Sequence, residues 1–230
     1  MTERVGWPGR RNNDVQVTTV ARTDETLYRC CESLEYRVFV ESGYVEENPD
    51  GRIAALDRYP HHVFLAALTG DRAFPPERRL SGVMRIITAP HARKMGPGLF
   101  PTLDHGSELR IDPEKLARIM RMDPRRFIDI ATMAIPGENR DARTSTALIT
   151  ELMQRVWGMP PLRYALAAID TVFYEKLKAR DLPFADLGPS VLYWGSPSTA
   201  TIGDSYRALR GVRRLVMAYY RVRGWARVIR

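Results

Sequence analysis

Apolar and polar positions in the first part of the chain follow two simple patterns. Residues 15–21 alternate and are rich in β-branched side chains, which is typical of a strand. Residues 23–25 then supply a cap and an acidic first turn for an amphipathic helix that runs to about Ser42, and Gly43 ends it. The pattern therefore predicts a strand followed by a helix with one buried face, whose candidate core positions are Leu27, Leu34, Val38 and Phe39.

The rest of the chain is predicted to contain further strands and helices of moderate length. Apolar runs bounded by Gly and Pro favour strands, whereas apolar positions at helical spacing favour helices. Residues 44–59 and 90–101 have neither pattern and are expected to be loops. The expected strands are 62–68, 80–88, 126–135, 164–169 and 190–193, and the expected helices are 112–122, 144–157, 172–180 and the final basic segment.

This order of elements predicts the fold class. A strand, a helix, several antiparallel-looking strands and then a strand–helix–strand–helix–strand run indicate a mixed α/β (α+β) sheet with helices on both faces. The regular alternation of a doubly wound nucleotide fold is missing. A chain of 230 residues suits one domain. We expect a flexible lead over residues 1–14, the folded domain over 15–204, and a basic helical extension over 205–230.

Composition places the chain among ordinary globular proteins. The apolar fraction is 44% and the charged fraction is 27%. No apolar run approaches the roughly 20 residues that span a bilayer, and the polar N-terminus lacks the apolar core of a signal peptide. We interpret the chain as a cytoplasmic protein. The two cysteines, Cys30 and Cys31, are adjacent, and no Cys/His set has metal-ligand spacing, so we expect no bound metal.

The net charge of +8 is confined to one segment. Residues 205–230 contain eight arginines and no acidic residue, so subtracting them from 35 basic residues leaves 27, which equals the 27 acidic residues. We favour docking of an acidic acyl carrier protein by this tail. One alternative is binding to an anionic membrane surface, which would make the protein peripherally membrane-bound. The others are binding to nucleic acid and a merely solvated basic face on a packed helix.

The segment of residues 129–153 is the most informative for chemistry. A buried strand ends at Pro136-Gly137, and a turn with small and basic residues leads into an apolar helix. A helix N-terminus offers unpaired N–H groups to a phosphate. Small side chains would let a pyrophosphate approach the backbone, and arginines would add positive charge. The candidate phosphate-binding residues are Arg140, Ala142, Arg143, Thr144 and Ser145. No Walker loop and no dinucleotide-binding glycine motif are present.

This segment resembles the acyl-CoA signature of the GNAT superfamily of acyltransferases. In that family a strand is followed by Gln/Arg-x-x-Gly-x-Gly/Ala at the start of a helix, and residues 140–145 occupy the corresponding place. The resemblance implies a GNAT-like mixed sheet and an acyl-CoA or acyl-carrier-protein co-substrate, with no permanently bound cofactor. It implies that strand N–H groups near Met133, Ala134 and Ile135 hold the thioester of the phosphopantetheine arm.

A second segment strengthens this resemblance. GNAT enzymes commonly carry Asn-x-x-Ala-x-x-Leu-Tyr-Glu-Lys-Leu-Gly-Phe on the helix after the next strand, and residues 170–177 and 180–184 are similar. Tyr174 falls at the family's tyrosine, which can protonate the departing thiolate. Its ordinary pKa near 10 keeps the phenol protonated at neutral pH. The structural alternative is a packing tyrosine whose hydroxyl binds a backbone carbonyl.

The N-terminal half resembles acyl-homoserine-lactone synthases and the related N-acyl amino acid synthases. The similar segments are residues 35–44, 56–59, 82–88, Phe100-Pro101 and 129–135. The resemblance implies that Phe39, Arg85 and Thr132 bind the acceptor, with the planar guanidinium of Arg85 binding a carboxylate. It implies Asp57 and Asp129 as candidate bases, the latter only if burial raises its pKa. Surface caps and ion pairs are the structural alternatives for these residues.

Departures from the lactone-synthase motifs bear on the acceptor. Glu35 stands at an arginine position, Tyr44 near a tryptophan position, and Thr132 at the strand arginine, while residues 106–122 look like an insertion. Ala55 and Pro60 replace two carboxylates, and Asp129 replaces a glutamate. We therefore favour acyl transfer to an amino acid. Acyl-homoserine-lactone synthesis is the first alternative, and a non-catalytic nucleic-acid- or membrane-binding protein is the second.

Overall fold

The computed structural model describes residues 15–59, 61–139, 142–158, 161–179 and 184–204. The expected flexible lead, the basic tail and Arg140 lie outside these ranges. The described residues form two compact units. The first comprises residues 15–54, 63–85 and 132–152, and the second comprises 55–62, 86–131 and 153–204 within the described part of the chain.

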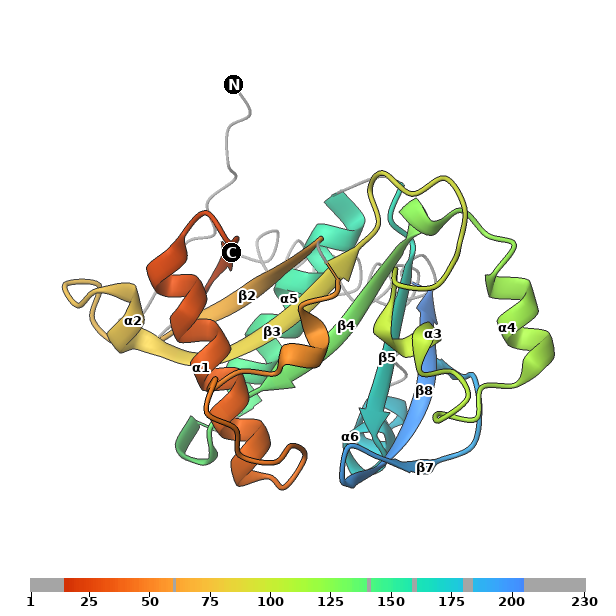
Figure 1. Ribbon diagram of the computed structural model, residues 1–230. Helices are drawn as coiled ribbons and strands as arrows, with labels where there is room; N and C mark the ends of the chain where they lie inside the picture. The colour runs from red at the N-terminus through yellow and green to blue at the C-terminus, as the bar shows by residue number, and fades with distance from the viewer. Residues whose placement is uncertain (1–14, 60, 140–141, 159–160, 180–183, 205–230) are drawn as a thin grey trace, which may run out of the picture. The chain divides into compact units, whose positions relative to one another are not determined.

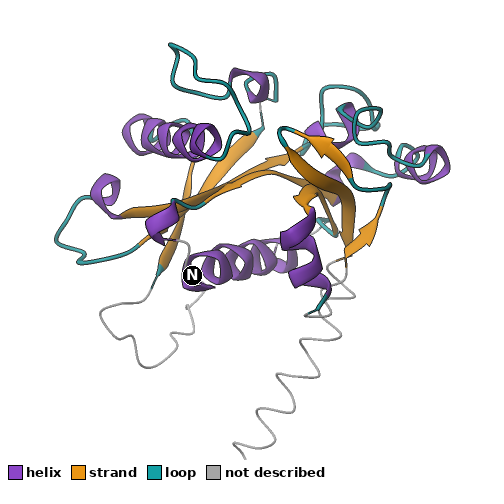
Figure 2. Cartoon of the chain, turned by 90° about the horizontal axis from the view of Figure 1, so that it is seen from below, coloured by secondary structure: helices purple, strands orange, loops and turns teal. Residues whose placement is uncertain are grey.

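The first unit is built on the N-terminal strands and two long helices. Its strands are β1 (Gln16–Val20), most of β2 (His62–Leu68) and most of β3 (Leu80–Thr88), and β1 pairs with β2 in antiparallel register from Gln16↔Leu68 to Val20↔Phe64. The long helices α1 (Glu25–Glu41) and α5 (Ala142–Gly158) cover opposite faces of these strands (Figures 1 and 2). The short helix α2 (Pro76–Arg79) joins β2 to β3.

Helix α1 has the caps and the buried face that its sequence predicts. The Asp24 side chain accepts a hydrogen bond from the Leu27 N–H at 3.4 Å, which satisfies one of the unpaired donors of the first turn. Ser42 caps the other end, and Gly43 takes a φ of 71°, a conformation that glycine adopts without steric cost. All four predicted core positions are buried, so this prediction is confirmed.

The second unit is built on β5 and β8. Strand β5 (Tyr164–Asp170) pairs with β8 (Ser196–Asp204) in antiparallel register over its whole length. The short strands β6 (Phe184–Asp186) and β7 (Val191–Tyr193) also pair with β8. Helices α3 (Pro101–Asp104) and α6 (Thr171–Lys178) lie on opposite faces of β5, and α4 (Pro113–Ile119) precedes β4 (Figures 1 and 2).

The strands together form the mixed sheet that the sequence predicts. Their order is β1-β2-β3-β4-β5-β8-β6, with β7 paired to β8. Strand β4 (Phe127–Ala134) is parallel to β5, and the two pair from Phe127↔Tyr164 to Ile130↔Ala167. The pairing ends there although β4 continues to Ala134 and β5 to Asp170. The strands therefore splay apart in the second half of β4, as expected for a GNAT-like sheet. Short 3₁₀ turns occur at Ala54–Leu56, Pro124–Arg126 and Gly137–Asn139.

Strand β8 is a nine-residue element that the sequence pattern does not predict. Most of its residues, SPSTATIGD, are small or hydroxylated, and they form no apolar run. Six of the nine are nevertheless buried, and the Thr201 hydroxyl donates to the Ala167 carbonyl at 3.1 Å. Pairing to β5 and local hydroxyl bonds satisfy these polar groups, so burial does not require large apolar side chains. The short elements α2, α3 and β6 were likewise not expected.

The apparent insertion at residues 106–122 packs within the second unit. Its helix α4 is capped by Asp112, whose own N–H donates to the Leu187 carbonyl at 2.9 Å. Gly188 lies so close to the backbone before α4 that a Cβ on Gly188 would be 2.3 Å from the Arg110 carbonyl oxygen. Arg110 itself has a φ of 47°, which is uncommon outside glycine. The backbone of residues 110–112 is thus fixed against 187–188.

We predict that Gly188→Ala destabilises the protein by about 1–3 kcal/mol, because the new methyl group would press on backbone that cannot rotate away. Gly96→Ala is the matched control, since a Cβ there meets nothing within 4 Å. Urea unfolding of both variants measures the difference. Equal midpoints for the two variants would show that the contact between 188 and 110 is loose.

Candidate active site

A buried ion pair in the first unit contains one of the predicted acceptor residues, Arg85. Arg85 and Glu35 are 1% and 0% exposed, and the guanidinium donates two hydrogen bonds to the carboxylate, at 3.1 Å from Nε and 2.6 Å from Nη2. The Thr132 hydroxyl also donates to Glu35. The structure therefore links Arg85 and Thr132, two of the predicted acceptor residues, through a third residue. Glu35 was noted only as a departure from the lactone-synthase motif.

Charges around Arg85 keep its guanidinium ionised despite burial. Burial by itself would lower the pKa of Arg85, but the Glu35 carboxylate outweighs that effect and the pKa is raised. Glu32 lies 3.7 Å from the same Nη2 atom, and the guanidinium stacks 4.5 Å from the centre of the Phe64 ring. Two carboxylates thus surround one cation in a site from which water is nearly excluded. This arrangement fixes α1 against β3 and the end of β4.

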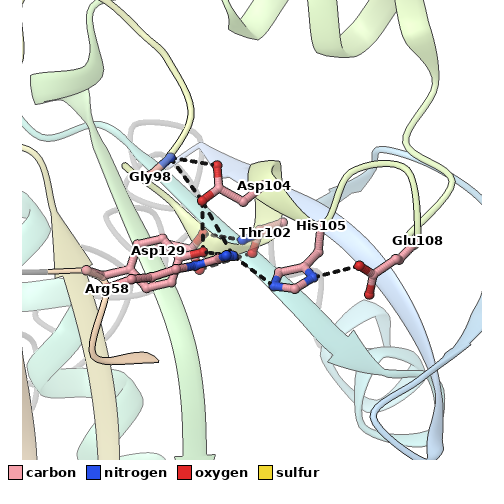
Figure 3. Close-up of polar contacts among 8 residues, drawn as sticks. Arg58, Gly98, Thr102, Asp104, His105, Glu108 and Asp129 are labelled. Atoms are coloured by element: carbon pink, nitrogen blue, oxygen red, sulfur yellow. Dashed lines mark hydrogen bonds and ion pairs between the residues drawn. The ribbon is translucent and has the colours of Figure 1, made fainter. Parts of the chain in front are cut away.

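A second buried carboxylate lies in the second unit. Asp129 on β4 is 0% exposed, and it accepts hydrogen bonds from the Thr102 N–H at 2.9 Å and the Thr102 hydroxyl at 3.0 Å (Figure 3). Burial raises the pKa of Asp129 to about 7, although both Thr102 bonds act in the opposite direction, and the nearby Asp104 charge raises it further. The condition for Asp129 to act as a base near neutral pH, a pKa raised by burial, is thus met.

Helix α3 organises the polar residues around Asp129. The Tyr59 hydroxyl donates to Asp104 at 2.9 Å, and Asp104 also accepts from the Gly98 N–H at 3.0 Å. Arg58 donates to the Tyr59 oxygen at 2.6 Å and lies 3.2 Å from Nε2 of His105 (Figure 3). Because a guanidinium only donates, His105 accepts at Nε2 and therefore carries its proton at Nδ1, 3.1 Å from Glu108.

The predicted acyl-donor segment comprises the end of β4 and the start of α5 in the first unit. Ala134 is fully buried, and Met133 and Ile135 are half-buried. Helix α5 begins at Ala142, two residues earlier than expected; Thr144 is buried, Ser145 half-buried and Arg143 exposed. A Cβ at Gly82 on β3 would lie 2.8 Å from Thr144 Cγ2 and 3.1 Å from Ile135 Cγ1. Gly82 therefore lets β3 approach the start of α5 closely.

Tyr174 on α6 is 2% exposed and packs among Ala167, Ile169 and Leu177. Its hydroxyl donates to Asp186, and the Lys178 ammonium lies 4.3 Å from the ring centre. Burial, and then the Asp186 carboxylate, raise the pKa of Tyr174, so the phenol stays protonated. The hydroxyl binds a carboxylate rather than the backbone carbonyl of the structural alternative. Its role in proton transfer stays a prediction.

The remaining predicted site residues occupy separate positions. Phe39 is 8% exposed and packs edge-on against Tyr44, with ring centres 5.4 Å apart. Asp57 is half-buried in the turn after the 3₁₀ segment Ala54–Leu56. Sequence reasoning did not identify Thr102 or Asp104 as site residues. The signal nearest to them was the Phe100-Pro101 motif directly before Thr102, whose Pro101 begins α3.

No protein-family model and no curated protein sequence matches the chain significantly. Solved structures do match. The CoA-dependent acyl-homoserine lactone synthase BjaI, with SAM and isopentyl-CoA, is 18% identical, with 86% of this chain and 87% of that chain covered and a TM-score of 0.61. The AHL synthase LasI is 15% identical, with 84% and 90% covered and a TM-score of 0.58. FeeM, an N-acyl amino acid synthase from uncultured soil microbes, is 14% identical, with 82% and 90% covered and a TM-score of 0.50.

The chain has the GNAT fold. These matches, together with the parallel β4–β5 pair that splays after Ile130↔Ala167, confirm the fold expected from residues 129–153 and 170–184. At such low identity the likeness establishes the arrangement of the chain and leaves the activity to be argued from the site.

Three further kinds of site were considered for the described residues: a metal site, a membrane-spanning helix and a nucleophilic thiol. Among the described residues, no group of three or more His, Cys, Asp or Glu side chains is placed to hold a metal ion. Within the same ranges, no helix is long and apolar enough to cross a bilayer. Cys31 is buried, and burial raises its thiol pKa, so the thiolate needed of a nucleophile is disfavoured.

We predict that ionisation of Asp129 makes stability fall as pH rises. The unfolded pKa is about 3.9 and the folded pKa is about 7, so the folded state holds a proton that the unfolded state releases. The stabilisation from this proton is complete below pH 4 and is lost as pH rises through 7. The free energy of unfolding should fall by roughly 4 kcal/mol in total, at 1.36 kcal/mol per pKa unit. Urea unfolding between pH 4.5 and about 8 measures it. Asp129→Asn should flatten this part of the profile, and parallel profiles for both proteins would contradict the assignment.

Proposed function

We propose that this chain is an N-acyltransferase, which moves an acyl group from a pantetheine thioester to an amine, and that the acceptor is an amino acid. The GNAT fold, with a splayed β4–β5 pair and a helix starting just after β4, is the observation that carries the proposal. The solved relatives with this fold are named as acyl-homoserine lactone synthases, one with isopentyl-CoA bound, and as an N-acyl amino acid synthase.

The acyl donor is assigned to the segment between β4 and α5. Where β4 no longer pairs with β5, its N–H groups near Met133 to Ile135 are the candidates for holding the thioester carbonyl as negative charge develops. The N-terminus of α5, with Ala142, Thr144 and Ser145, is the candidate pyrophosphate site, and Arg143 is exposed beside it. Arg140 completes this assignment from the sequence. The donor is acyl-CoA or an acyl carrier protein.

The acceptor amine must lose a proton before it can attack, because an ammonium has no lone pair. Asp129 is the preferred base, since its pKa of about 7 lets it accept a proton near neutral pH. Asp57 is the second candidate. The amine nitrogen then forms a bond to the thioester carbon, the C–S bond breaks, and Tyr174 is assigned to protonate the thiolate.

The acceptor end is assigned to Phe39, Arg85 and Thr132. Glu35 already occupies the guanidinium of Arg85 with two hydrogen bonds, so an acceptor carboxylate can bind there only if it displaces Glu35. The alternative is that Glu35 and Glu32 keep Arg85, and that these carboxylates attract the cationic end of the acceptor. Both versions predict that Glu35→Gln changes the acceptor KM more than the donor KM.

Acyl-homoserine-lactone synthesis is the alternative reaction, and the BjaI match with SAM favours it. Lactone formation from an acylated SAM would release methylthioadenosine, whereas transfer to an amino acid releases only the thiol.

The basic tail of residues 205–230 is proposed to dock an acidic acyl carrier protein, with an anionic membrane surface as its other candidate. A binding-only role on nucleic acid or membrane is the alternative from another class.

Purified protein should acylate an amine when it is given acyl-CoA or acyl carrier protein thioesters. Thiol release is followed with a thiol-reactive dye, and mass spectrometry identifies the product. Gly82→Val should raise the donor KM, because the side chain would displace Thr144 at the start of α5. Gly96→Ala serves as the control. Absence of thiol release with every donor and acceptor, SAM included, would contradict the proposal.

Tyr174→Phe should lower the single-turnover rate by roughly 10²-fold, the usual scale of general acid catalysis, with little change in donor affinity. The variant keeps the ring's packing and removes only the hydroxyl that binds Asp186. A purely structural hydroxyl would instead cost about 1 kcal/mol of stability and leave the chemical step unchanged. Thermal melting and rapid-quench rates on the same variant separate these outcomes.

A further inference from the structure

The Arg58 guanidinium in the second unit is held through one of its nitrogens. Its Nη2 atom donates to the Tyr59 hydroxyl oxygen at 2.6 Å and to Nε2 of His105 at 3.2 Å (Figure 3). The face of the guanidinium lies over the Tyr59 ring, 4.9 Å from its centre. Nη1 and Nε make no hydrogen bond within the part of the chain that the structure describes. Three N–H groups of an oriented cation are therefore available to an anion.

The exposure of Arg58 distinguishes it from Arg85, the residue assigned above to an acceptor carboxylate. The Arg58 side chain is 53% exposed, whereas that of Arg85 is 1% exposed and donates from Nε and Nη2 to Glu35. The hydrogen bond to Tyr59 raises the pKa of Arg58, so the guanidinium stays charged. A carboxylate that approaches Nη1 or Nε of Arg58 thus meets an accessible cation and displaces no carboxylate of the protein from these atoms.

Helix α3 connects Arg58 to the preferred base. Asp104, whose Oδ2 atom lies 3.7 Å from Nη2 of Arg58, is the last residue of α3 and accepts the hydrogen bond from Tyr59. Thr102, two residues earlier in α3, donates from its N–H and its hydroxyl to Asp129. A single short helix therefore holds both the guanidinium and the base. In an α-amino acid the carboxylate and the amine are attached to one carbon, so a group that binds the carboxylate also positions the amine.

We propose that Arg58 binds the carboxylate of the amino-acid acceptor and thereby determines which amines are acylated. This inference deepens the proposed acyl transfer and rests on it. Because the Tyr59 ring and His105 already orient the guanidinium, little side-chain freedom is lost when a carboxylate binds. SAM carries the same carboxylate next to its amine, so Arg58 would have the same role if SAM were the acceptor.

Pairs of acceptors that differ in the carboxylate test the proposal. Each standard amino acid is assayed by thiol release beside its α-carboxamide, which keeps the amine and the side chain but lacks the negative charge, and SAM is assayed beside decarboxylated SAM. For the pairs that the wild-type protein acylates, Arg58→Gln should lower the ratio of kcat/KM with the carboxylate to kcat/KM without it roughly 10-fold or more, the scale of a lost charge-assisted hydrogen bond. Arg58→Lys should recover part of the ratio, because the charge remains while the planar fork is lost.

Arg125→Gln is the matched control, because the Arg125 side chain is 54% exposed and is paired with Asp123 at 2.7 Å in the same unit. It should leave the ratio and the melting temperature unchanged, and Arg58→Gln should leave the donor KM unchanged.

Three results would overturn the proposal. Equal losses with both members of each pair in Arg58→Gln, or no loss with either, would remove Arg58 from the acceptor site and leave acyl transfer intact. A ratio that falls in Glu35→Gln but not in Arg58→Gln would assign the carboxylate to Arg85 instead. A wild-type protein that releases no thiol with any of these acceptors would overturn the proposed acyl transfer together with this inference.

Discussion

Burial of the Asp129 carboxylate is the constraint on which the arrangement of the second unit depends. A carboxylate without water must be protonated or receive hydrogen bonds, and Thr102 supplies two of them. These bonds hold α3, a helix of only four residues, against β4. Asp104, at the other end of α3, then holds Tyr59. The same burial raises the pKa of Asp129 to about 7. Burial of this carboxylate therefore accounts both for the position of α3 and for the proposed role of Asp129 as a base.

The first unit likewise contains a buried charge, the guanidinium of Arg85, which must be compensated by polar partners. Glu35, Arg85 and Thr132 come from α1, β3 and β4, and Glu35 accepts hydrogen bonds from both of the others. Removing one partner of a buried ion pair strands the other charge and typically costs about 3–5 kcal/mol, although the intact pair adds little net stability. Such a cluster specifies one register of helix against strand. Within it, the Glu35 carboxylate also occupies the Arg85 guanidinium, which is one of the groups proposed above to bind an acceptor carboxylate.

A tyrosine and a carboxylate are the two groups proposed for the proton chemistry. Tyr174 lies in an apolar cluster and donates to Asp186, which suits a phenol that must stay protonated until a thiolate forms. Asp129 is buried and held by two hydrogen bonds from Thr102, and burial raises its pKa to about 7. The first suits the leaving group and the second suits the attacking amine.

The sequence by itself determined the elements whose apolar positions recur with a regular period. Residues 62–68 and 80–88 are strands with the predicted bounds, and helices α1 and α5 end within two residues of the predicted positions. It also indicated the GNAT fold, because the strand–turn–helix around Thr144 and the helix around Tyr174 are local features. Local pattern is enough where a segment's own side chains decide its conformation.

Only the tertiary structure decided which polar groups meet. Strand β8 has no apolar run, and its burial depends on pairing with β5 rather than on its own residues. Glu35 and Thr132 are 97 positions apart, and Thr102 and Asp129 are 27 apart, so no periodic pattern could join them. The pKa of Asp129 is likewise a property of its surroundings, because burial and hydrogen bonding come from distant segments of the chain.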